Sequence, residues 1–167
     1  MSVPTRVSRL AVRPPGTSRV FAYFATGARA LDDKVALILR LKKVFVFAPS
    51  VTFYDINEQT DGILSATIEA TRQADDFNAE GIFVAWMEYN IQPGMAQTAG
   101  TTYTPVVLSS PLIYEPPQPG EDFAHEYLRF GIATNADAFN TYRFHLHYQM
   151  VETTADEFVR LKQQRNF

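Results

Sequence analysis

The histidines His145 and His147 are the side chains in this sequence best placed to do chemistry together. One residue separates them in a segment of alternating polarity, so on a strand both rings lie on one face and can reach one metal ion. A zinc site needs at least one more ligand, such as His125 or a carboxylate from a neighbouring strand, and no such residue stands at a diagnostic spacing. The sequence therefore favours the polar, solvent-facing side of an edge strand, flanked by Arg143 and Gln149, over a metal site.

Other catalytic arrangements have weaker support. The acidic pairs Asp32-Asp33 and Asp75-Asp76 lie beside turn residues, and adjacent carboxylates point in different directions, so they are interpreted as helix or turn caps or as solubilising charge. The chain has no cysteine, no Gly-x-Ser-x-Gly nucleophile setting and no glycine-rich phosphate loop. The sequence thus predicts no catalytic residue and no cofactor, and we expect a protein that is not an enzyme.

The histidine pair belongs to the clearest strand pattern of the chain, Tyr142–Val151. Every second residue there is large and apolar, which predicts one face turned to a core. That face comprises Tyr142, Phe144, Leu146, Tyr148 and Met150.

Further segments are predicted to be strands. Residues 19–26, 34–47, 62–73 and 126–134 show the period of two that is typical of strands. Residues 82–91 are largely apolar on both faces, and residues 103–108 and 112–114 are short extended pieces. In the segment 34–47 the alternation slips at Lys42-Lys43, which predicts a bulge or a bend between two sheets. Pro116 to Gly120 predict a stiff turn of polyproline type at a sheet edge or in a long connection.

The two ends of the chain differ from the middle. Residues 1–17 contain three prolines, a glycine and three arginines, and are interpreted as a basic arm rather than a packed element. Residues 1–19 carry four arginines and no acid, so the other 11 basic residues of the chain stand against all 18 acidic ones. Residues 153–167 are predicted to form a short helix and tail, with a capping-box pattern from Thr154 to Glu157 and an apolar stripe of Phe158 and Leu161.

About eight strands with mixed connections, and no alternation of strands with helices, predict an all-β fold. The most economical version at 167 residues is an antiparallel β-sandwich or jelly roll over residues 18–152, between the arm and the helix. The chain has no apolar run long enough to span a bilayer as a helix, and its start lacks the apolar region of a signal peptide. We therefore expect synthesis in the cytoplasm without secretion.

Together, the strand pattern, the basic arm and the terminal helix resemble the single jelly-roll capsid proteins of icosahedral viruses. More narrowly, they resemble the smaller major capsid protein of tailless double-stranded DNA phages with an internal membrane. The resemblance implies a virion protein that self-associates and pairs with a second capsid protein, made in the host cytoplasm. The residues expected at assembly contacts are Arg6, Arg9, Leu10, Arg13, Phe158 and Leu161. The arm is also expected to make weak contact with lipid headgroups or nucleic acid, because arginines neutralise phosphate.

Two alternative functions remain open from the sequence. One is a β-sandwich module that binds carbohydrate or protein through Trp86, or through Tyr103 and Tyr114. The other, less favoured, is a cupin-like metal enzyme built on His145 and His147.

Overall fold

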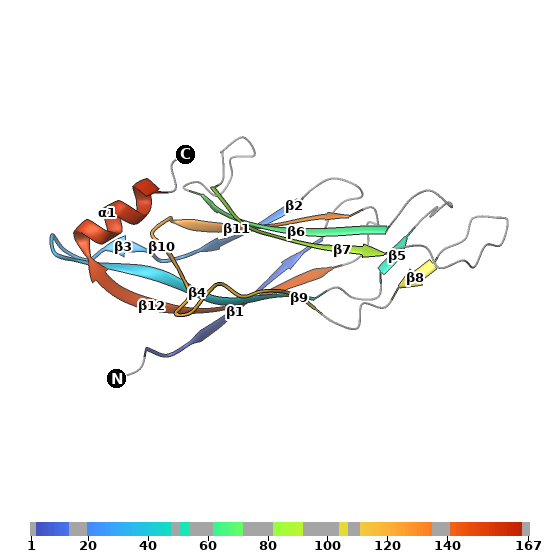
Figure 1. The fold of residues 1–167 in the computed structure, drawn as a ribbon, viewed down its shortest axis with the longest axis horizontal. Coiled ribbons are helices and arrows are strands. Elements are labelled where there is room, and N and C mark those ends of the chain that lie inside the picture. Colours follow the sequence, from blue (N-terminus) through green and yellow to red (C-terminus); the bar gives the residue numbers. More distant parts are fainter. Residues whose placement is uncertain are drawn as a thin grey trace.

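The computed structural model describes residues 3–13, 20–47, 51–53, 62–71, 82–91, 104–106, 111–134 and 141–164. In this part of the chain two antiparallel sheets face each other, and a short helix lies at one end (Figure 1). The first sheet has six strands: β1 (Arg6–Val12), β12 (Tyr142–Thr154), β4 (Val35–Phe47) and β10 (Glu121–Phe123) in that order, with β3 (Arg29–Ala30) and β9 (Leu112–Tyr114) also paired to β4. The second has four, in the order β2 (Val20–Ala25), β11 (Tyr127–Thr134), β6 (Gly62–Thr71) and β7 (Ile82–Ile91). A separate pair is formed by β5 (Val51–Phe53) and β8 (Thr104–Val106).

The order of pairing is that of a jelly roll. The first strand pairs with the last, β2 with β11, β4 with β9 and β10, and β6 with β7, so that each pair is nested within the one before. Successive nested pairs belong alternately to the six-stranded and the four-stranded sheet. A long hairpin rolled up in this way produces the two Greek keys of the jelly roll. The predicted all-β class and sandwich architecture are therefore confirmed.

The main core fills the space between the two sheets. On β12 the predicted inward face is confirmed, because Tyr142, Phe144 and Leu146 are completely buried and Tyr148 and Met150 pack against the same cluster. The four-stranded sheet contributes alternate residues of β6 and β11: Ala66, Ile68, Ala70, Leu128, Phe130 and Ile132. Burial of apolar surface on this scale is the main favourable term in the stability of the domain.

The predicted irregularity at Lys42-Lys43 is a β-bulge. His147 pairs with Lys43, but the next residue of β12, Tyr148, pairs with Leu41, so Lys42 is an extra residue in β4. Because of this extra residue, apolar side chains on both sides of the bulge point into the core: Leu41 and Val44 are each completely buried there.

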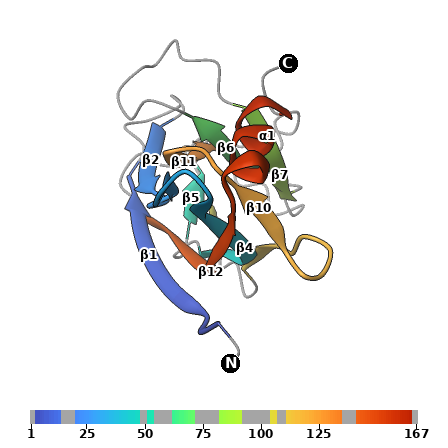
Figure 2. The same ribbon diagram turned by 90° about the vertical axis from the view of Figure 1, so that its left-hand side faces the viewer.

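The interpretation of residues 1–17 as an unpacked arm needs a correction, because residues 6–12 form β1. This strand runs antiparallel to β12 from Arg6 opposite Tyr148 to Val12 opposite Tyr142 (Figure 2). Val12 is buried and Leu10 packs against the main core, whereas Ser8 is half-buried and Arg6 is exposed, so the second half of β1 contributes to the core. The prolines that suggested an arm stand outside the strand. The second correction follows from the first: β12 lies between β1 and β4, and is therefore a central strand rather than an edge strand.

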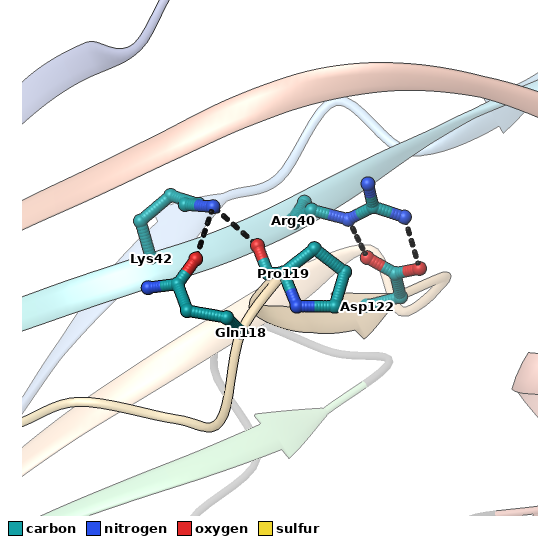
Figure 3. Close-up of polar contacts among 5 residues, drawn as sticks. All are labelled: Arg40, Lys42, Gln118, Pro119 and Asp122. Carbon is teal, nitrogen blue, oxygen red and sulfur yellow. Dashed lines mark hydrogen bonds and ion pairs between the residues drawn. The ribbon is translucent and has the colours of Figure 1, made fainter.

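Residues 115–120 connect β9 to β10 through a turn that is fastened to β4. The amide of Gly120 donates to the carbonyl of Pro117 at 2.8 Å, which closes the turn that the sequence predicted, and the Gln118–Pro119 peptide bond within it is cis. Lys42 donates to the side chain of Gln118 and to the carbonyl of Pro119 (Figure 3).

The strand that follows this turn is held by an ion pair. The guanidinium of Arg40 donates to both carboxylate oxygens of its cross-strand partner Asp122, at 2.7 and 2.8 Å (Figure 3). This contact raises the pKa of Arg40 above its already high value. The prolines thus lie at the edge of the sheet, where the sequence placed them, and β10 is anchored to β4 by a bidentate contact.

The terminal helix α1 (Ala155–Gln164) begins as the capping pattern predicted. The hydroxyl of Thr154 accepts a hydrogen bond from the amide of Glu157 at 3.2 Å, while the Glu157 carboxylate pairs with Arg160 and does not complete the capping box. Phe158 packs with Ala28, Ala36, Ile38 and Ala124 in a second core cluster, with Leu161 beside it. The helix therefore docks on its own domain. Within the described residues, no helix has the length and hydropathy needed to cross a membrane.

Candidate functional site on the six-stranded sheet

The outward side of the six-stranded sheet brings together side chains from both ends of the chain. The strand register places Arg9 of β1 opposite His145, His145 opposite Phe45 of β4, and Phe45 opposite Ile113 of β9. A neighbouring row runs from Val7 through His147 to Lys43, and another from Ala11 through Arg143 to Phe47. We call this surface the ring face; it comprises Val7, Arg9, Lys43, Phe45, Phe47, Ile113, Arg143, His145 and His147.

Four rings touch one another at the centre of the ring face. The rings of Phe45 and Phe47 are stacked with centroids 6.0 Å apart. His147 meets Phe45 edge to face at 5.3 Å, and His145 lies against Phe47 at 4.6 Å in a tilted arrangement. Such contacts stabilise ring pairs by about 0.5 to 1.5 kcal/mol beyond simple burial. Each ring is therefore held in place by its neighbours before any partner arrives.

Positive charge surrounds these rings. Two exposed arginines neighbour His145: Arg9 lies opposite it on β1, and Arg143 precedes it by two residues on β12. The ammonium group of Lys43 lies 5.2 Å from the centroid of the Phe45 ring and pairs with Glu115 at 2.9 Å. Partial burial, followed by the charges of Arg9, His147 and Arg143, lowers the pKa of His145, because each of these disfavours the imidazolium form.

The ring face also exposes apolar surface. Val7 is 52% exposed, Ile113 50% and Phe47 39%. Large aromatic side chains are usually buried in a single soluble domain, so an exposed Phe beside arginines is an informative feature. With neutral histidines, the ring face carries three cationic side chains and borders one acid, Glu115, whereas the whole chain has a formal net charge of -3.

The suggested third metal ligand lies elsewhere. His125 is buried and follows Phe123 of β10 by two residues. Phe123 pairs with Leu39 of β4, and Leu39 in turn pairs with Met150 of β12. Met150 lies five residues beyond His145 on β12, roughly 16 Å at the rise of a strand. Within the described residues, no group of three or more histidines or acidic side chains could hold a metal ion. The two histidines face outward onto phenylalanine rings, away from the barrel interior.

The structure places the expected assembly residues in different surroundings. Arg9 belongs to the ring face, and Arg13 is exposed just past the end of β1. Arg6 lines an open pocket of about 730 Å³ near the start of β1 together with Arg29, Tyr148 and Glu152, among others.

The remaining expected contacts are turned towards their own chain. Leu10 is half-buried against the main core, and Leu161 packs against the second cluster. Phe158 is only 7% exposed, so a contact with another chain would require α1 to undock. Whether any of these residues meets a neighbouring subunit stays a prediction.

Of the aromatic residues suggested for a binding module, the structure places only the side chain of Tyr114. Tyr103 lies outside the described residues, and so does the placement of the Trp86 side chain. Tyr114 is partly buried against the main core, and its hydroxyl donates to Glu121 at 2.6 Å.

Sequence reasoning missed the phenylalanines of the ring face. The available signal was that residues 44–47 are apolar on both faces of one strand, although only one face is needed for the core.

Comparison with known proteins yields similarities of fold only. No protein-family model and no curated protein matches the sequence. Among solved structures, the chain is similar to one from Cocksfoot mottle virus, with 16% identity, a TM-score of 0.38, and coverage of 90% of this chain and 94% of that one. It is also similar to chains from infectious bursal disease virus, Gt strain (10% identity, TM-score 0.23), and from the VP2 subviral particle of that virus (10%, 0.24).

These similarities are distant. The alignments cover 95% and 93% of this chain, but the chain spans only 47% and 44% of the length of the two infectious bursal disease virus chains. With TM-scores below 0.5, the similarities assign neither a family nor a function to this protein.

Proposed function

We propose that this protein is a structural subunit of a virus shell and acts by associating with copies of itself. The observation that carries the proposal is a jelly roll whose interior is filled by its own side chains. Jelly rolls serve as capsid subunits, lectins and cupins. In the described part of the barrel, Phe123, Phe130 and Phe144 are completely buried between the sheets, and both histidines of the candidate metal pair face outward. What the domain offers to a partner is therefore its outer surface.

The distribution of exposed apolar side chains supports several partners rather than one ligand. Phe47 and Ile113 are exposed on the six-stranded sheet, Leu31 in the turn between β3 and β4, and Val159 on α1. A module that binds a single ligand needs one site, whereas a subunit of a closed shell contacts neighbours through more than one surface.

The finer parts of the proposal follow from the resemblance of the sequence. The shell is icosahedral, of the kind built by tailless double-stranded DNA phages with an internal membrane, and a second capsid protein pairs with this one. The protein then resides in the virion. Within this proposal, β1 is the segment that meets a neighbour, through the exposed Arg6, Arg9 and Arg13.

The oligomeric state tests the proposal. Light scattering on the purified protein at rising concentration should show oligomers, and electron micrographs of concentrated samples should show particles of uniform size. Val159→Asp should lower the oligomeric state without lowering the melting temperature, because Val159 is half exposed on α1. Gln163→Asp adds the same charge at another exposed position of this helix and serves as the control. A parent protein that stays monomeric at high concentration in all conditions contradicts the proposal.

A further inference from the structure

We propose that the ring face binds single-stranded nucleic acid, with bases stacked on Phe47 and its neighbouring rings and phosphates held by Arg9 and Arg143. This inference rests on the geometry of the six-stranded sheet alone and does not depend on the shell function. It assigns a ligand class to the most unusual surface of the domain.

The rings form a preorganised stacking surface. Phe47 is exposed, yet its ring contacts the rings of Phe45 and His145, at centroid distances of 6.0 and 4.6 Å. A side chain already held in place loses little conformational entropy when a ligand binds. All four bases have a flat π-face, so such a surface accepts single strands with little sequence preference.

Two arginines lie beside the rings and are therefore positioned to bind the phosphates of a nucleic-acid strand whose bases stack there. Arg9 lies on β1, across β12 from Phe45, and Arg143 directly adjoins Phe47 in the register. Two strand spacings separate β1 from β4, about 10 Å. In the described part of the chain neither arginine takes part in an ion pair, whereas Lys43 is paired with Glu115. Both guanidinium groups can therefore bind phosphate without first giving up a partner.

The combination of rings and arginines distinguishes this ligand from other anions. An acidic protein segment or an anionic membrane would be attracted by the same arginines but would gain little from flat ring faces. A duplex keeps its bases stacked on each other and offers mainly phosphate. Only a single strand presents both unstacked bases and phosphates to the sheet.

Fluorescence anisotropy with labelled oligo(dT) and oligo(U) of about 20 nucleotides, longer than the usual site of one small domain, tests the inference. Both probes should bind the full-length protein, and more tightly than a DNA duplex of equal length. Affinity should fall between about 50 and 200 mM salt, with a slope that reports the number of phosphates contacted.

Two variants separate the roles of rings and charges. Phe47→Ala should weaken binding about tenfold, the equivalent of about 1.4 kcal/mol, and leave the salt slope unchanged, because it removes stacking alone. The double variant Arg9→Gln with Arg143→Gln should weaken binding and reduce the slope by about 1.4, since each phosphate contact on a single strand contributes about 0.7.

Matched substitutions outside the ring face serve as controls. Leu31→Ala removes another exposed apolar side chain, and Arg29→Gln removes another exposed charge; both lie in or beside the turn before β4. Both controls should bind as the parent does.

Three results would overturn the inference. The first is the absence of oligonucleotide binding at about 50 mM salt. The second is binding that is equal for heparin or phosphatidylserine vesicles and unchanged in Phe47→Ala, which would indicate a general anion surface. The third is an equal loss of affinity in Arg29→Gln and in the ring-face arginine variant, which would place the site elsewhere.

Discussion

The two faces of β12 are built from alternate residues of one strand, and they differ in almost every physical respect. Its inward face consists of Tyr142, Phe144 and Leu146, completely buried and packed against the opposite sheet. Its outward face presents the exposed Arg143 and the half-buried His145 and His147, whose rings contact Phe47 and Phe45 of β4. The inward side chains are held by burial in the core, whereas the outward side chains are surrounded by residues of the neighbouring strands.

The difference shows how stability and binding are divided within this domain. Substitutions on the inward face must change the free energy of unfolding, because the core leaves no room for a polar group. Substitutions on the outward face should mainly change what the surface can bind. Paired variants on neighbouring residues of the same strand can therefore test this division directly.

The largest expected effect is that of Leu146→Asp. A carboxylate at this completely buried position loses the Leu packing and has no partner, which should cost more than about 5 kcal/mol, comparable to the whole stability of a small domain. We expect no soluble folded protein. His147→Asp, one residue further on the outward face, is the control and should yield a folded protein with a cooperative melting curve. Similar yields and melting temperatures for both would show that the assigned register is wrong.

Removal of residues 1–12 should have the next largest effect. The sequence alone favoured an arm whose loss leaves the barrel folded, but β1 covers one side of β12 and buries Val12 and part of Leu10. Burial of a valine or leucine side chain contributes about 1.5 to 3 kcal/mol, so we expect a loss of about 3 kcal/mol in unfolding free energy. Denaturant unfolding measures it. Removal of residues 1–4 alone, which precede β1, is the control; equal stability of both truncated proteins would contradict the pairing of β1 with β12.

The inward face could be predicted from the sequence and the ring face could not, for a physical reason. Alternation along Tyr142–Val151 and the slip at Lys42-Lys43 are local patterns, and both predicted what the structure shows. Arg9 and Phe45 reach His145 only through pairing with β1 and β4, and no local pattern specifies which strands pair. The strand β1 itself was missed because prolines stand on both sides of it and because its residues do not alternate in polarity: Val7 faces outward, whereas Ser8 is half-buried.

Phe158→Ala should have an intermediate effect and tests where α1 docks. Phe158 packs in the second core cluster, and truncation of a buried phenylalanine typically costs about 3 to 5 kcal/mol, with the lower end expected for a cluster this small. Val159→Ala, at the next and half-exposed position, should change stability by less than about 0.5 kcal/mol. Thermal melting of the two variants compares them. If Phe158→Ala melted with the parent, the helix would dock somewhere other than on its own barrel.

The smallest expected effect concerns pH and the outward face. Burial and the charges of Arg9, His147 and Arg143 lower the pKa of His145 in the folded protein, with Lys43 and its partner Glu115 as the other charged groups on this surface. The unfolded chain therefore takes up a proton at a higher pH than the folded one. Stability should fall modestly as the pH drops through about 6.5, the ordinary range of histidine, and level off below the lowered pKa.

Comparison of the parent with His145→Gln isolates this contribution. Melting temperatures measured from about pH 8 to pH 5 should fall less in the variant, because it lacks the His145 imidazole, whose protonation at low pH destabilises the folded protein. Oligonucleotide binding should show the opposite dependence: a protonated His145 adds positive charge to the ring face, so affinity rises as the pH falls. Identical pH profiles of stability in the two proteins would show that His145 is not linked to folding. Identical profiles of binding would place the bound phosphates away from this ring.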